Sequence, residues 1–241
     1  MTNLIFDGND FCEFFLVEKV SYDLPSLDID TQDVPGMDGV AFTGATTSMP
    51  PLTVRLTSKP GTVSHRRALK RKLAEWLDVD EPKRLFTVED DGRYRYAVPS
   101  GSPSITEGTD TFSAEVSFEF PDPYLYGETR RIPLTEVSNT FRVRGTVPTL
   151  PTIAVSATPS GGYIGLRLDD GDVMQVPATA ASSVVADCMD RVVTANGTVA
   201  MITLDSDWFE LSPGTHTIAR EIGTFTTDES LNYIEFTERW R

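Results

Sequence analysis

The sequence predicts a mainly β protein of two domains, with one α-helix in the first domain. Three observations carry this prediction. Apolar and polar residues alternate without a break from Phe112 to Phe120, as in a strand with one buried face. One segment, residues 64–78, has an apolar stripe at helical spacing. After residue 127, short apolar runs are separated by turn residues, which is typical of a β-sandwich.

The boundary between the domains is predicted directly after this alternating strand. Pro121 and Pro123 lack backbone donors and fix φ, so the strand cannot continue through them. The composition also changes: residues 128–241 contain no lysine, nine arginines and fifteen acidic residues. The predicted domains are therefore residues 1–127, a β-barrel or sandwich-like domain with one helix, and residues 128–241, a β-sandwich.

The first domain begins with short β segments. An apolar run at residues 4–6 and a Gly-containing turn at residues 7–10 predict a hairpin into residues 14–22. Residues 28–45 hold two Gly turns and little apolar periodicity, so we expect a turn-rich excursion there and not a core element. Residues 52–57 alternate again and predict a half-buried strand.

The helix is predicted over residues 64–78, with Ser64 as its N-cap. Its apolar stripe consists of Leu69, Leu73, Trp76 and Leu77. Its N-terminal half is crowded with bases: Arg66, Arg67, Lys70, Arg71 and Lys72. Because the helix dipole disfavours positive charge at that end, we expect an acidic neighbour. A DNA-binding helix is the alternative, and a net charge of −15 argues against it.

Further hairpins are predicted on either side of the domain boundary. Residues 84–89 and 93–98 flank an Asp-Asp-Gly turn, and residues 99–110 form a polar loop before the long strand. In the second domain we expect hairpins and a final alternating strand at the following positions: 163–168 with 173–176, 191–194 with 199–204 around Asn196-Gly197, and 231–240.

Charge is unevenly distributed in the first domain. Residues 1–50 hold nine acids and one lysine, a net charge of −8, whereas residues 51–84 hold nine bases and four acids, a net charge of +5. These blocks are either ordinary solvated faces or two halves of a self-complementary interface. The interface candidates are Asp28, Asp30, Asp33 and Asp38 on the acidic side and Arg67, Lys70 and Arg71 on the basic side.

Motifs for chemistry are not expected in this chain. The spacing of Asp28, Asp30 and Asp33 fails the calcium-loop pattern, because Asp33 stands where Gly is needed. The two histidines are far apart, as are Cys12 and Cys188, which we expect to be buried thiols. We therefore expect no catalytic residue, metal or cofactor. No apolar run reaches the roughly 18 residues of a membrane span, and no signal peptide is expected.

Several short motifs follow one another in a recognisable order: Phe6-Asp7-Gly8, Val34-Pro35-Gly36-Met37-Asp38-Gly39, Ala74-Glu75-Trp76-Leu77 and Asp122-Pro123-Tyr124. Over about 125 residues this order resembles the N-terminal domain of siphophage distal tail proteins, although that family often has a basic residue at the Met37 position. The run from Trp208 to Gly214, with Ser212-Pro213-Gly214 after an aromatic pair, is similar to the family's C-terminal domain. The resemblance implies a galectin-like or carbohydrate-binding-module-like fold for the second domain.

The resemblance also implies a function. Distal tail proteins are structural hubs of the tail tip, in which six copies form a ring through their N-terminal domains. The tail tube docks on one side, a tail-associated lysin, tail fibre or receptor-binding protein attaches on the other, and DNA passes through without specific binding. The protein would be assembled in the host cytoplasm and reside in the virion.

Two other functions remain open from the sequence. One is a carbohydrate-binding module or adhesin, for which the aromatic candidates are Tyr163, Trp208, Tyr233 and Trp240. The other is a different phage tail component, such as a tube protein built on a similar barrel. A sandwich fold alone does not confer lectin activity.

Overall fold

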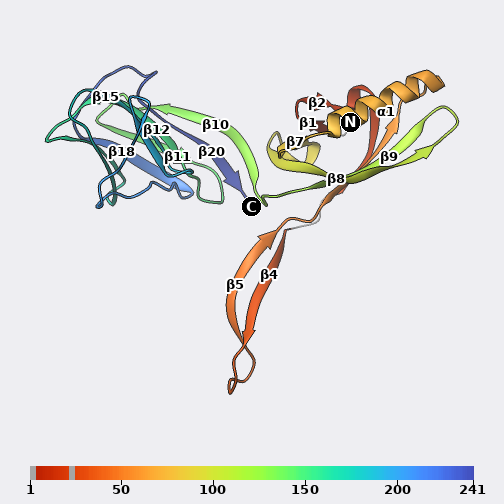
Figure 1. Ribbon diagram of the computed structural model, residues 1–241, viewed down its shortest axis with the longest axis horizontal. Coiled ribbons are helices and arrows are strands. Elements are labelled where there is room, and N and C mark those ends of the chain that lie inside the picture. The colour runs from red at the N-terminus through yellow and green to blue at the C-terminus, as the bar shows by residue number, and fades with distance from the viewer. Residues whose placement is uncertain (1–3, 22–24) are drawn as a thin grey trace. The chain divides into compact units, whose positions relative to one another are not determined.

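The computed structural model describes residues 4–21 and 25–241. The chain forms two compact units (Figure 1): one ends at Leu125 and also includes Arg241, and the other is Tyr126–Trp240. The change of unit lies within strand β10 (Leu125–Pro133). The fold is mainly β with α1 (Val63–Leu77) in the first unit, as the sequence predicted.

The first unit is built from antiparallel strands. Its elements are β1 (Leu4–Phe6), β2 (Asn9–Asp10), η1 (Phe11–Glu13), β3 (Phe15–Ser21), β4 (Ser26–Asp33), β5 (Val40–Ser48), β6 (Leu52–Ser58), α1, β7 (Lys83–Thr87), η2 (Val88–Asp90), β8 (Tyr94–Glu107) and β9 (Phe112–Glu119). The long strand β8 belongs to two runs of paired strands. It pairs with β7 in the order β2-β1-β7-β8 and with β9 in the order β3-β6-β9-β8.

The core of the first unit lies against β6, β9 and α1. Strand β9 buries Phe112, Ala114, Val116 and Phe118, the apolar half of its alternation. Leu69 and Leu73 of α1 are 3% and 2% exposed and belong to the same core. Burying a leucine side chain of this kind contributes about 1.5–3 kcal/mol to folding. The predicted strands in residues 52–57 and 112–120 are confirmed.

The N-cap of the helix lies two residues before the predicted one. Thr62 is the N-cap, and its Oγ1 accepts a hydrogen bond from the His65 backbone N–H at 3.2 Å, whereas Ser64 lies inside the first turn. Both are hydroxyl residues with suitable spacing, and the extended backbone of Thr62 decides between them. Within the described residues, no helix is long and apolar enough to cross a membrane.

Two predictions for the first unit are wrong in detail. Strand β1 pairs with β2 and β7, and β3 pairs with β6, so the N-terminal run forms no hairpin with residues 14–22; Tyr22 lies outside the described residues. Residues 99–110 are not a loop, because β8 continues to Glu107. Pro99 stands opposite Phe118 in the ladder with β9, and Pro103 lies within a register shift between Ser100 and Ser104.

The expected turn-rich excursion is instead a regular hairpin. Strands β4 and β5 pair from Ser26↔Ser48 to Asp33↔Val40, with a bulge opposite Asp30, and form a two-stranded sheet of their own. All eight residues of β4 are exposed, so the expectation that this segment is not a core element holds. We call β4, β5 and the turn between them the arm (Figure 1).

The second unit is a two-sheet sandwich. Its strands are β10, β11 (Ser138–Val143), β12 (Thr152–Thr158), β13 (Tyr163–Leu168), β14 (Asp172–Pro177), β15 (Ser182–Asp187), β16 (Val192–Ala195), β17 (Thr198–Ala200), β18 (Gly214–Ile222), β19 (Thr224–Phe225) and β20 (Tyr233–Trp240). One sheet has the order β17-β16-β15-β12-β20-β10, with β19 pairing β12, and the other has the order β11-β18-β13-β14.

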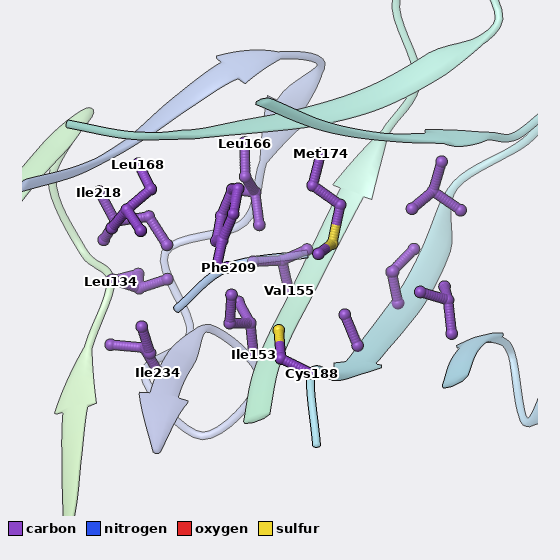
Figure 2. Close-up of a cluster of buried hydrophobic side chains, with 14 of the residues drawn as sticks. Leu134, Ile153, Val155, Leu166, Leu168, Met174, Cys188, Phe209, Ile218 and Ile234 are labelled. Atoms are coloured by element: carbon purple, nitrogen blue, oxygen red, sulfur yellow. The ribbon is translucent and has the colours of Figure 1, made fainter. Parts of the chain in front are cut away.

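Inward-facing side chains of both sheets fill the sandwich (Figure 2). Phe209 lies among Leu166, Val155 and Ile153 and is fully buried. Burial raises the pKa of the Cys188 thiol to about 11, which keeps it neutral in the core at ordinary pH. The hairpins β13–β14 and β16–β17 confirm the sequence prediction, although β17 ends at Ala200 and not at residue 204.

Candidate subunit interface

The four aspartates of the arm do not form one cluster. Because alternate residues of a strand face opposite ways, Asp28 and Asp30 lie on one face, and Asp33 lies on the other, opposite Val40. Asp28 Oδ2 accepts a hydrogen bond from Ser48 Oγ at 3.0 Å. Asp38 lies in the turn at the tip. The sequence grouped these carboxylates as one acidic surface, and the hairpin divides them between two faces and the tip.

The second face of the arm is apolar, which the sequence reading missed. Leu27, Ile29, Val40 and Phe42 share this face, and their exposed fractions are 60%, 60%, 51% and 68%. Exposed apolar side chains gathered on one surface mark interaction sites. The signal was present as the alternation Leu27-Asp28-Ile29-Asp30, which is the period of a strand.

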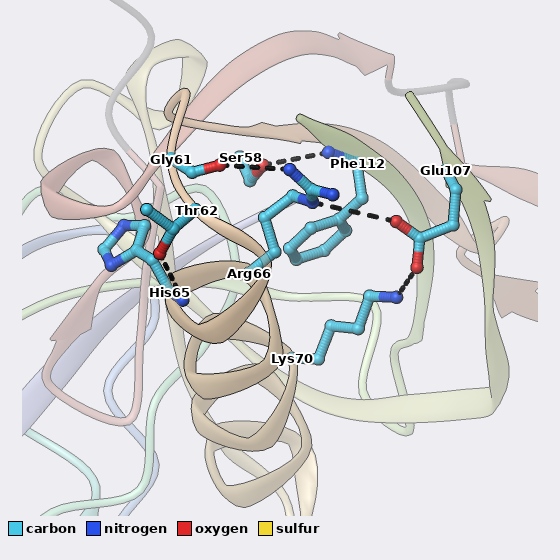
Figure 3. Close-up of polar contacts among 8 residues, drawn as sticks. All are labelled: Ser58, Gly61, Thr62, His65, Arg66, Lys70, Glu107 and Phe112. Carbon is cyan, nitrogen blue, oxygen red and sulfur yellow. Dashed lines mark hydrogen bonds and ion pairs between the residues drawn. The ribbon is translucent and has the colours of Figure 1, made fainter. Parts of the chain in front are cut away.

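The basic side chains of α1 are also divided between contacts inside the unit and solvent. Lys70 forms an ion pair with Glu107 of β8, 37 residues away (Figure 3), and its ammonium lies 5.2 Å from the centre of the Phe112 ring. Arg66 Nε lies 4.0 Å from the same carboxylate, and its Nη1 donates to the Gly61 carbonyl at 3.0 Å. The hydrogen bond from Lys70 lowers the pKa of Glu107. Glu107 therefore supplies the acidic neighbour that the helix needs.

Arg67 and Arg71 are placed differently from Lys70. Both are exposed, and neither makes an ion pair within the described residues. Of the three basic interface candidates, Lys70 is thus engaged inside its own unit, whereas Arg67 and Arg71 present their charges to solvent. Positions 67, 70, 71 and 74 recur at helical spacing, so these side chains follow one side of α1.

A groove of about 500 Å³ runs along that side of α1. Ala74 and Leu77 line it from the helix together with the acidic Glu75 and Asp78, and Pro103 and Ile105 line it from β8. Its floor includes the buried Val116 of β9, and Ile105 at its wall is 44% exposed. Lys70 lies at the same groove, so the exposed arginines continue the helix side that borders it.

The histidine of the second unit is held by two acceptors. His216 is 8% exposed; its Nδ1 lies 2.8 Å from Asp169 Oδ2, and its Nε2 lies 2.6 Å from the Ser212 carbonyl oxygen. Asp169 also accepts a hydrogen bond from the Thr217 backbone N–H at 2.8 Å. This geometry fastens the β13–β14 turn to the start of β18 and gives His216 a structural role.

The aromatic candidates for sugar binding do not converge on one platform. Tyr233 and Trp240 are seven residues apart on β20 and therefore face opposite ways, and Tyr163 belongs to the other sheet. Trp208 packs against the sandwich core. The Arg131 guanidinium covers the Tyr233 ring at 3.3 Å from its centre.

Two family models match the chain. Residues 6–120 match the phage tail protein RIFT-related domain, and residues 144–240 match the C-terminal domain of the siphovirus-type tail component. No curated protein matches the chain.

Solved structures match over the whole chain. The chain is 20% identical to the SPP1 Dit (gp 19.1) protein, described as a paradigm of the hub adsorption apparatus in phages that infect Gram-positive bacteria, with a TM-score of 0.80 and full coverage of both chains. It is 9% and 10% identical to chains of the phage P2 baseplate in its activated conformation with calcium or strontium. In both P2 cases the TM-score is 0.54, and the match covers 100% of this chain and 98% of the other. At these identities the likeness establishes the fold.

Proposed function

Because this chain belongs to the siphophage distal tail proteins, we propose that it forms a homo-hexameric ring that joins the tail tube to the host-adsorption apparatus. It is a phage tail protein and a component of the virion. In this proposal the ring is formed by the first domain predicted from the sequence, residues 1–127 with its helix, and the second predicted domain is residues 128–241.

The observation that carries the proposal is a pair of unlike surfaces on the first unit. The arm has four aspartates and no basic residue between Ser26 and Ser48, whereas Arg67 and Arg71 of α1 face solvent. A closed ring needs heterologous contacts, in which one patch of a subunit meets a different patch of the next. Unlike charges on the two patches suit such a contact, because they favour this pairing over arm-to-arm pairing.

The ring's partners follow from the same role. The tail tube docks on one side, and a tail-associated lysin, tail fibre or receptor-binding protein attaches on the other. The net charge of −15 would repel the DNA that passes through the bore. In this proposal the protein acts by geometry and not by catalysis.

Light scattering across a concentration and salt series tests the ring. We expect a species with the mass of about six chains that weakens as salt rises, because exposed charges are screened within about 10 Å at 0.1 M salt. Arg67→Glu combined with Arg71→Glu should shift the protein toward single chains. A matched control is Arg142→Glu with Arg144→Glu, which makes the same charge change at exposed positions of the second unit and should leave assembly unchanged.

The outcomes separate the alternatives. A single-chain species at every concentration that is retained by glycans would support a carbohydrate-binding module or adhesin. Rings that stack into long tubes would support a tube protein. Assembly that is unchanged by the arginine substitutions and by salt would contradict the charge pairing. Retention of DNA by the ring at low salt would contradict the proposal that the bore repels DNA.

A further inference from the structure

We propose that the groove beside α1 receives the apolar face of the arm from a second copy of the chain. This inference rests on the ring proposal and assigns the surfaces that meet in it. We assign the arm to this groove because the arm and the groove have complementary apolar surfaces and complementary charges. The arm has an apolar strip with acidic residues toward its tip. The groove has apolar side chains along its length, with the exposed Arg67 and Arg71 toward the helix N-terminus and the acidic Glu75 and Asp78 toward the helix C-terminus.

The apolar side chains of the arm suit the groove in their chemistry and in their size. On the arm, Leu27, Ile29, Val40 and Phe42 stand exposed on one face. In the groove, the side chains available to them are Ala74, Leu77, Pro103 and Ile105, over a floor that includes Val116. A volume of about 500 Å³ holds several side chains of this size. The exposed fractions of these four side chains, 51–68%, show that the described residues of the chain do not cover the apolar face of the arm.

The charges then set the direction of the arm in the groove. Asp33 lies on the apolar face toward the tip, and Asp38 lies at the tip itself. From Ile29 to Asp33 the strand advances roughly 13 Å, and from Ala74 back to Arg67 the helix spans roughly 10 Å. If Ile29 and Phe42 lie over Ala74, the tip of the arm therefore reaches Arg71 and Arg67.

This direction divides the four aspartates by function. Asp33 and Asp38 meet the arginines of the next copy, whereas Asp28 and Asp30 lie on the face turned away from the groove. The charge reversal Asp33→Arg should weaken assembly and should be rescued by Arg71→Asp in the same chain. The reversal Asp30→Arg should not be rescued by Arg71→Asp.

Substitutions on the two faces of the arm test the apolar contact. Phe42→Glu should weaken assembly about tenfold or more, because it places a charge at the centre of a buried contact. The control Gln32→Glu adds the same charge on the opposite face and should change assembly by about twofold or less. In the groove, Ile105→Glu should act like Phe42→Glu, and its neighbour Thr106→Glu, which does not line the groove, should act like the control.

Disulfide trapping in the full chain tests the same contact directly. Two proteins are mixed under oxidising conditions, one with Phe42→Cys and the other with Ile105→Cys, both in a Cys12→Ser background. We expect a linked pair, identified by mass spectrometry of the joined peptides. Replacing Phe42→Cys with Gln32→Cys should abolish the product, because position 32 points away from the groove.

The two proposals fail in different ways. If the six-chain species forms but Phe42→Glu and Ile105→Glu leave it intact, the ring stands and the groove assignment is wrong. If no cross-link forms between positions 42 and 105 at any concentration, the groove assignment is overturned whatever the mass of the protein. If the cross-link forms but only linked pairs and no closed species appear, the groove assignment stands and the hexameric ring does not.

Discussion

The arm and the hairpin β13–β14 share a sequence pattern but have opposite fates. Both alternate apolar and polar residues and close through a turn with acidic residues and glycine. Strand β13 buries Ile164, Leu166 and Leu168 in the sandwich and pairs with β18 as well as β14. Among the residues that the structure describes, β4 and β5 of the arm pair with each other alone, and Leu27 is exposed. Alternation thus predicts a strand, and the presence of a cover decides whether its apolar face is buried.

The largest expected difference is in the free energy of unfolding that is lost when a leucine of each hairpin is replaced by alanine. Leu168→Ala should lower the free energy of unfolding of the second unit by about 2–5 kcal/mol, because it leaves a cavity in a packed core. Leu27→Ala should cost less than about 0.5 kcal/mol in the dilute protein, since that side chain is 60% exposed. Urea denaturation followed by circular dichroism measures both. Equal losses would mean that the arm is covered within its own chain.

A smaller difference in stability is expected when an aspartate that accepts hydrogen bonds is removed from each hairpin. Asp169→Ala removes the acceptor for His216 and for the Thr217 backbone, which should cost about 1–2 kcal/mol, at the lower end because Asp169 is partly exposed. Asp28→Ala removes one exposed hydrogen bond with Ser48 and should change stability by less than about 0.5 kcal/mol. Thermal unfolding ranks the two. Asp169→Asn, which keeps an acceptor for the Thr217 N–H, should recover part of the loss.

The smallest expected effect is on local opening and not on global stability. In the single chain, backbone amides of β4 and β5 should exchange with solvent about a hundredfold faster than those of β13, because a two-stranded sheet without a core opens easily. In the assembled form, the exchange rate of the arm amides should fall toward that of the β13 amides. Hydrogen exchange at low and high protein concentration measures the difference, and an arm that exchanges slowly at both concentrations would break the comparison.

Much of the fold could be predicted because local pattern and burial agree. The alternation in β9, the helical stripe of α1 and the Asn196-Gly197 turn each identify their element from neighbouring residues alone. The prediction failed where tertiary pairing overrides local signals. Pro99 and Pro103 suggested a loop, yet the ladder with β9 carries β8 through them with a register shift.

The candidate interface could be predicted only in part. The sign of the two charged surfaces was visible in the sequence. The commitment of Lys70 to Glu107 was not, because it depends on strand β8 passing beside the helix. The separation of Asp33 from Asp28 and Asp30 was also hidden, since it follows from the hairpin register, and the apolar face was missed for the same reason.

The bulge in the arm has a consequence for newly synthesised copies. An unpaired two-stranded ribbon with an apolar face is a template for aggregation, because its free edges can recruit another ribbon. The bulge opposite Asp30 interrupts the flat edge, and the carboxylates of Asp28 and Asp30 repel an identical ribbon. We therefore expect these two aspartates to keep the protein soluble while it accumulates during infection. Neutralising them should reduce the yield of soluble protein even where the finished virion has no use for their charge.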